Sequence, residues 1–295
     1  MGQGAIDYIG VKGGLDINGI IEDYYVYAGE KVSAGDFVEF INGIASSTKE
    51  TSVDTLITSS VETDYMFPVL LSNGNVFICY GTRVGSTLYG MVCSVEGAKI
   101  VPGTQTTLST QAGAGQVFSA ELLSNDNIFI AYRHGNTSKE RYLYGMTVEV
   151  EGTTLTVKNT KQLASGTYAG YYGLVIKTIL IDTDKIYVAH SYQNNYALAG
   201  LVVSVSSSLS ITTGTDVEVG GFGNGSNIEM YLGLLEPNKV FIACGESDEL
   251  YGYIAQVSNT TISLGNIATI STVQNASYYA SIVPLSSDKV FIAHN

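Results

Sequence analysis

Five short apolar runs recur along the chain at intervals of roughly 50 to 60 residues. They read VFICY, IFIAY, IYVAH, VFIAC and VFIAH, and they begin at Val76, Ile128, Ile186, Val240 and Val290. Their apolar residues are consecutive rather than alternating, so we expect both faces of each strand to be buried. Sheets that pack face to face around an axis meet this requirement, and the period is typical of a repeat array or a propeller.

Each run stands between two further apolar segments. A segment with a tight turn precedes it, as in PVLLSNGN or AELLSNDN, and a motif such as LYGMVCSV or LYGMTVEV follows the first four runs. In the first repeat this pattern predicts strand a at 65–71, strand b at 76–80, strand c at 88–95 and strand d after the EG turn. Four antiparallel strands per repeat predict an all-β fold, a β-propeller of about five four-stranded blades.

A glycine recurs in every strand c, at Gly90, Gly145, Gly200 and Gly252. Because a glycine leaves room for a close neighbour, we interpret these as packing positions where a neighbouring sheet or aromatic ring approaches.

The fifth repeat stops after strand b. The predicted blades lie near 65–110, 116–164, 173–219 and 228–273, with 278–295 as half of a last one. The segment DFVEFINGIAS, from Asp36 to Ser46, matches strand c and its hairpin, with Val38, Ile41 and Gly43 placed like Val92, Val95 and Gly97. We therefore expect residues 36–60 to complete the last blade, so that the propeller spans 36–295 and has no exposed sheet edge. The alternative is a fragment of a longer array. Residues 1–35 are expected to form an attachment or oligomerisation arm.

Composition and charge limit the kinds of structure and of binding partner that we expect. The 295 residues include 33 Gly and 21 Tyr, and only 14% are charged, which favours short strands and turns over helices. The formal net charge of −13 opposes the neutralisation of phosphate, so no nucleic acid is expected as a partner. No basic flank with an apolar run opens the chain and no segment is long enough to cross a bilayer, so neither export nor membrane insertion is predicted.

The residues that carry chemistry favour structural interpretations. Cys79, Cys93 and Cys244 fall in predicted strands, and a buried small hydrophobe is favoured over a Cys79–Cys93 disulfide. His190 and His294 occupy one repeat position that also takes Tyr and Cys, and His134 is interpreted as a surface residue. Asp182 and Asp184 align with the turns of other repeats, so turn formation is favoured over calcium binding.

Motifs of familiar hydrolases are missing from the chain. It has no Trp, hence no tryptophan-containing sialidase box, and it has no G-x-S-x-G elbow, P-loop or H-E-x-x-H motif. These patterns predict a protein that is not an enzyme, with no catalytic residue, no metal site and no cofactor.

Variable, polar loops are expected on one face of the ring, where the b–c and d–a connections emerge. Aromatic rings and amides in such loops suit a carbohydrate ligand, because sugar faces stack and hydroxyl groups form hydrogen bonds. The alternative for any single residue is that it covers the end of a blade. The candidate ligand-binding residues are Arg133, Tyr168, Tyr171, Tyr172, Tyr192, Asn194, Tyr196, Phe222 and Asn224.

The stretch VYAGEKVSAGDFVEFING, followed by VFIAYRHGNTSKERYLYGMTVEVEGTTLTV, resembles phage tail-fibre and virion-appendage proteins with β-propeller repeats. The resemblance implies a tail-fibre or receptor-binding propeller that contacts host surface polysaccharide. It further implies attachment to other virion or tail proteins through the arm, a homo-oligomer, and a virion location after assembly in the host cytoplasm. The alternatives are a non-adhesive collar, neck or capsid appendage and, ranked last, a glycan-processing enzyme.

Overall fold

The computed structural model describes residues 38–41, 44–47, 63–82, 87–96, 99–111, 117–137, 140–164, 175–192, 197–221, 229–246, 249–272 and 280–294. The chain divides into two compact units, residues 1–59 with 94–101 and residues 60–93 with 102–295. In the described ranges every regular element is a β-strand except one 3-10 turn at Ser124–Asp126, and no helix there could cross a membrane. The predicted all-β class is confirmed.

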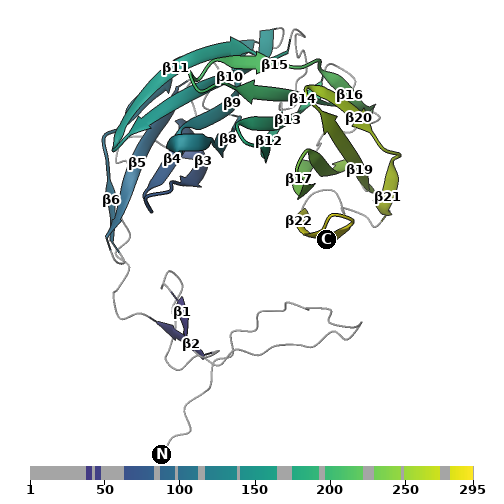
Figure 1. Cartoon of the computed structure of the whole chain (residues 1–295), viewed down its shortest axis with the longest axis horizontal. Helices are drawn as coiled ribbons and strands as arrows, with labels where there is room; N and C mark the ends of the chain where they lie inside the picture. Colours follow the sequence, from purple (N-terminus) through teal and green to yellow (C-terminus); the bar gives the residue numbers. More distant parts are fainter. Residues whose placement is uncertain are drawn as a thin grey trace, which may run out of the picture. The chain divides into compact units, whose positions relative to one another are not determined.

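Antiparallel sheets follow one another in chain order (Figure 1). The first sheet contains β3 (Thr63–Leu70), β4 (Val76–Thr82), β5 (Leu88–Glu96), β6 (Lys99–Pro102) and β7 (Thr106–Ser109). The second contains β8 (Phe118–Leu122), β9 (Ile128–Thr137), β10 (Glu140–Glu151) and β11 (Thr154–Gln162). The third contains β12 (Ile176–Asp182), β13 (Lys185–Tyr192), β14 (Ala197–Val205), β15 (Ile211–Thr213) and β16 (Val217–Gly221).

Two further sheets complete this series. The fourth contains β17 (Glu229–Glu236), β18 (Lys239–Glu246), β19 (Glu249–Ser258), β20 (Thr261–Leu264) and β21 (Ala268–Ser271), and the fifth contains β22 (Ala280–Ser286) and β23 (Lys289–His294). A two-stranded sheet of β1 (Val38–Ile41) and β2 (Ile44–Ser47) lies nearer the N-terminus. The strand boundaries predicted for the first repeat agree with β3, β4 and β5 to within a few residues.

The first strands of successive sheets are neighbours: β3 lies beside β8, β8 beside β12, β12 beside β17 and β17 beside β22 (Figure 1). Within each sheet the strands then follow in sequence order from this inner strand outward. Sheets arranged in this way are the blades of a β-propeller, and the chain forms about five of them. The domain limits and the joining of residues 36–60 to the last blade stay predictions.

The fourth strand of a blade is less regular than the sequence pattern suggested. In the first, third and fourth sheets it is split in two, and both pieces pair with the third strand. The split follows a glycine in each case: the backbone N–H groups of Gly103, Gly214 and Gly265 donate to the carbonyls of Val92, Val202 and Ile254. A bend of the backbone at these glycines ends one pairing and starts the next.

Apolar layers between neighbouring blades form the core. Alternate residues of an inner strand face opposite blades, so Val69 of β3 packs in one cluster with Ala120 of β8, and Gly233 of β17 lies against Ile282 and Pro284 of β22. The second strands of the first four blades are largely buried on both faces, and Phe129 on β9 has no exposed surface. The prediction is wrong for β23 of the last blade, where Phe291 is 55% exposed. Cys79, Cys93 and Cys244 are free and buried, which confirms the favoured interpretation.

The recurring glycine of the third strand is a packing position, as predicted. A Cβ atom at Gly145 would lie 2.9 Å from the ring of Phe129, and one at Gly200 would collide with the hydroxyl of Tyr187. Phe77 and Phe241 stand in the same way against Gly90 and Gly252. In these four blades an aromatic ring of the second strand therefore occupies the space that a larger third-strand residue would need.

The turn between the first two strands carries a carboxylate or amide that reaches back to the preceding blade. Asp126 accepts hydrogen bonds from the backbone N–H (2.7 Å) and the hydroxyl (2.6 Å) of Ser72, and Asp184 accepts the same pair from Ser124. Asp126 and Asp184 have φ values of 59° and 51°. The turn interpretation of Asp184 is thus confirmed, and its carboxylate also links two blades.

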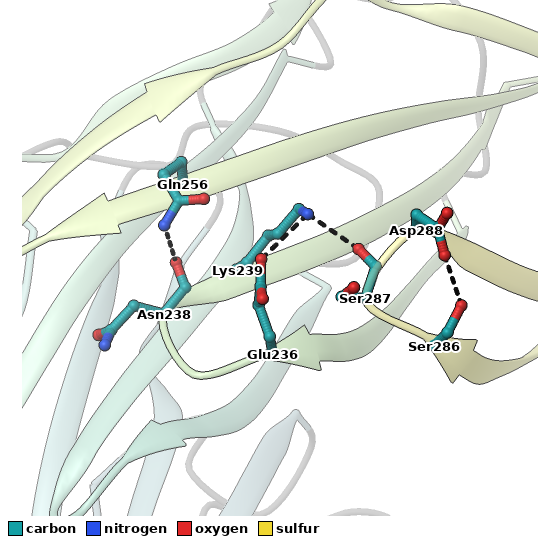
Figure 2. A network of polar contacts seen from close by, with 7 residues as sticks. All are labelled: Glu236, Asn238, Lys239, Gln256, Ser286, Ser287 and Asp288. Atoms are coloured by element: carbon teal, nitrogen blue, oxygen red, sulfur yellow. Dashed lines mark hydrogen bonds and ion pairs between the residues drawn. The ribbon is translucent and has the colours of Figure 1, made fainter.

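The same turns join the later blades through other groups. The backbone N–H of Asn238 donates to the carbonyl of Ile181, and Lys239 donates to the carbonyl of Ser287 at 2.8 Å while pairing with Glu236 at 3.1 Å. Figure 2 shows Lys239 reaching from the fourth blade to the turn of the fifth, where Ser286 donates to Asp288.

Candidate functional site

A polar cluster lies between the inner strands of the second and third blades. The hydroxyl of Thr178 on β12 donates to the Oε1 atom of Glu121 on β8 at 2.9 Å, and it lies 2.8 Å from the hydroxyl of Ser119. The backbone N–H of Thr178 also donates to Ser119 at 3.2 Å. Because the single hydroxyl proton of Thr178 is directed to Glu121, the Ser119 hydroxyl is the donor to Thr178. A chain of hydroxyl groups therefore ends on a carboxyl.

Glu121 stands where the other blades have no polar side chain. Strand pairing places it opposite Phe129, just as Val69, Ile179, Gly233 and Val283 stand opposite the corresponding aromatic residues. Burial raises the pKa of Glu121, and hydrogen bonds from Thr178 and from the backbone of Leu180 lower it only in part. A partly buried carboxyl that favours its protonated form is the kind of group that donates a proton in catalysis.

This residue was missed in the sequence. Its signal was available in the repeat alignment, because one acidic residue replaces an apolar residue or glycine at a position shared by five blades. A carboxyl in such a position is costly to desolvate unless hydrogen bonds compensate it, and Thr178 of the next blade provides one. The alignment of single residues across repeats, rather than a search for motifs, would have identified it.

The other carboxyls of the inner strands stand at their ends. Asp182 of β12 accepts a hydrogen bond from the backbone N–H of Thr183, and Glu236 of β17 pairs with Lys239. Both carboxyls therefore stabilise the turn between the first and second strands of their blade. Asp64 lies near the start of β3 and Glu229 begins β17, at the opposite end of their strands from these turns.

The predicted ligand-binding residues are mostly outside the described residues. Among them are Tyr168, Tyr171, Tyr172, Asn194, Tyr196, Phe222 and Asn224, and Tyr192 ends β13 without a described side chain. Arg133 near the end of β9 is described and is only 6% exposed, with its Nε donating to the carbonyl of Gly135 at 3.3 Å. Arg133 is thus part of the blade end, and the sugar-binding role of the whole set stays a prediction.

Two histidines have roles in packing. His190 is fully buried, and its ring nitrogens lie 3.0 Å from Asp216 and 3.2 Å from the carbonyl of Ser191, which supports the structural interpretation. His134 was interpreted as a surface residue but is half-buried: its ring stacks on Tyr144 at 4.4 Å, and burial lowers its pKa.

Comparisons with known proteins place the fold. No family model matches the chain, and no curated protein matches it. An α-L-arabinanase of Penicillium chrysogenum, solved with arabinobiose, is 13% identical, covers 78% of this chain with 77% of its own length, and has a TM-score of 0.50. A GH93 α-L-arabinofuranosidase of Fusarium graminearum, also solved with arabinobiose, is 10% identical over 79% of this chain and 74% of its own, with a TM-score of 0.51. At such identities the similarity shows the propeller fold.

These comparisons correct two predictions. The assignment to a phage tail or virion appendage, whether adhesive or structural, is wrong, because an α-L-arabinanase and an α-L-arabinofuranosidase share this fold over most of the chain. The prediction that the protein is not an enzyme is wrong on the same finding. The resemblance to virion appendages was carried by strand and turn sequences, which the propeller fold itself requires, and the missing motifs exclude only the hydrolases that use them. The predicted partners, oligomeric state and virion location stay untested predictions.

Proposed function

We propose that this protein is a glycan-processing enzyme that acts on arabinose-containing carbohydrate, with Glu121 as its proton donor. The observation that carries the proposal is a partly buried carboxyl on an inner propeller strand, which accepts a hydrogen bond from Thr178 in a position that is otherwise apolar. Its burial raises its pKa. The arabinobiose complexes of an arabinanase and an arabinofuranosidase with this fold support the substrate class.

Glycoside hydrolysis needs a carboxylic acid that protonates the leaving oxygen and a second carboxylate that activates water or attacks the sugar. The acid must hold its proton at the working pH, and burial of Glu121 acts in that direction. Thr178 fixes the orientation of the carboxyl through its hydrogen bond to Oε1.

The test is hydrolysis by the purified chain of arabinan, arabinobiose and 4-nitrophenyl α-L-arabinofuranoside. We expect release of arabinose or of the nitrophenol, and a loss of about 100-fold or more in kcat/KM for Glu121→Gln. Asp288→Asn is the matched control, because Asp288 is an exposed turn carboxyl, and it should retain activity.

Each outcome decides a separate part of the proposal. If the unsubstituted chain releases no product from any of the three substrates, the glycosidase assignment is overturned. Activity that persists in Glu121→Gln would remove Glu121 from the reaction and leave the assignment in place.

A further inference from the structure

The last blade exposes side chains that the preceding blades bury. Phe291 on β23 is 55% exposed, whereas its equivalents Phe77, Phe129 and Tyr187 have no exposed surface. Leu285 on β22 is 64% exposed, and its equivalent Leu71 is 2% exposed. In the preceding blades these positions pack against the following blade. The exposed apolar face of the last sheet is therefore a surface that another segment is expected to cover.

The last sheet also has a free edge in the described part of the chain. It contains only β22 and β23, whereas β4, β9, β13 and β18 each pair with a third strand on the side away from the inner strand. An unpaired strand of this kind presents a row of N–H and C=O groups that can accept another strand. The occupant should be a hairpin that supplies a third and a fourth strand.

Hairpin β1–β2 has the geometry of such a pair. Its register joins Ile41 to Ile44, with two residues between them. The third and fourth strands of the second blade join Glu151 to Thr154 in the same way, and those of the fourth blade join Ser258 to Thr261. Two-residue turns fix the register of a hairpin, so the hairpins can be superposed residue by residue.

This superposition shifts the alignment expected from the sequence by one residue. Val38 becomes equivalent to Cys93, Val148 and Ala255, which have no exposed surface, and not to Val92. A shift of one residue reverses which side chains face the core. The shift also places Gly35 three residues before Val38, just as Gly145 stands three residues before Val148, so the packing glycine recurs in a fifth copy.

We propose that hairpin β1–β2 adds to the free edge of β23 as the third and fourth strands of the last blade, with Val38 opposite Val290. The equivalent pairs elsewhere are Val76 with Cys93 and Ile128 with Val148. The inference concerns assembly of the ring and does not depend on the proposed enzymatic activity.

The test is a disulfide across the proposed pair, in the full chain with Val38→Cys and Val290→Cys. Directly opposed strand residues lie close enough to be bridged, and the native cysteines are buried away from oxidant. The matched control is Val38→Cys with Phe291→Cys, the register one residue away. We expect an intramolecular cross-link in the first variant and little in the second, read by mass spectrometry and non-reducing electrophoresis.

Other results overturn the proposal. A stronger cross-link in the control would reject the register, a cross-link between two chains would make a second copy the occupant, and no cross-link would reject the pairing. Amide hydrogen exchange of the unsubstituted chain gives an independent measurement if a variant fails to fold. Amides of 289–294 should exchange slowly, and deletion of residues 1–47 should make them exchange fast; equal exchange in the two chains would also reject the pairing.

Discussion

Asp184 accepts two hydrogen bonds from Ser124, one from its backbone N–H at 2.7 Å and one from its hydroxyl at 2.6 Å, and the two residues belong to neighbouring blades. Asp184 can do so because the backbone at the turn adopts a φ of 51°, which directs its carboxylate toward the preceding blade. Aspartate tolerates this left-handed conformation better than most residues.

Replacing Asp184 with Ala should lower the free energy of unfolding by about 2 kcal/mol, because two charge-assisted hydrogen bonds are lost and an Ala is placed at positive φ. Urea unfolding measures the change. Asp184→Asn separates the causes, since Asn retains the tolerance of positive φ and one acceptor. Equal stability of Asp184→Ala and the unsubstituted protein would show that the link contributes nothing.

Removing the hydroxyl group of Tyr187, on β13, should stabilise the protein. The hydroxyl oxygen is buried without a hydrogen-bond partner, and burial raises the pKa of the phenol above its ordinary range. Tyr187→Phe removes the cost of desolvating that group, and we expect the free energy of unfolding to rise by about 1 kcal/mol. Gly200→Ala is the opposing control, because its new methyl group would collide with the Tyr187 side chain. A clear destabilisation by Tyr187→Phe would reveal a hydrogen bond of that hydroxyl in solution.

Glu121 should make stability depend on pH. Its pKa is raised in the folded protein above the ordinary value of 4.5, so its favourable contribution is complete below that value and is lost as the pH rises through the folded pKa. Glu121→Gln keeps an acceptor for Thr178 but never ionises. We expect this variant to be more stable than the unsubstituted protein at pH 7.5 and to lose that advantage at pH 4, measured by urea unfolding. An advantage that does not change with pH would argue against a raised pKa.

The three thiols should be inert in the native protein. Burial raises the pKa of Cys79, Cys93 and Cys244, the last to about 12, so little reactive thiolate forms at pH 8. Labelling with iodoacetamide should proceed slowly in buffer and reach all three residues after denaturation in urea. Rapid labelling of Cys93 alone would show that β5 opens around this residue in solution.

Much of the fold was predictable because the same strand pattern recurs in successive repeats, so each copy supports the interpretation of the others. The run VFICY and its four copies marked the second strands, and the glycines of the third strands marked where aromatic rings pack. The breaks at Gly103, Gly214 and Gly265 were not predicted, since a glycine within a strand pattern does not say whether the strand bends or ends. Those bends depend on hydrogen bonds to another strand.

The candidate site was less predictable than the fold. The loop tyrosines are candidates on their chemistry alone, and the sequence does not say which of them converge. Glu121 and Thr178 lie 57 residues apart and meet only because β8 and β12 are neighbouring inner strands. A search for contiguous motifs does not detect such a pair, because the topology and not the spacing brings the residues together.

The links between turns carry a consequence for synthesis. The serine to aspartate contacts join residues 54 and 60 positions apart, and each lies between one blade and the next. As the chain leaves the ribosome, a new blade can therefore dock on the one made just before it, without waiting for distant segments. Assembly in this order keeps the growing apolar face to the width of a single blade at any moment, which limits the surface through which unfinished chains could aggregate.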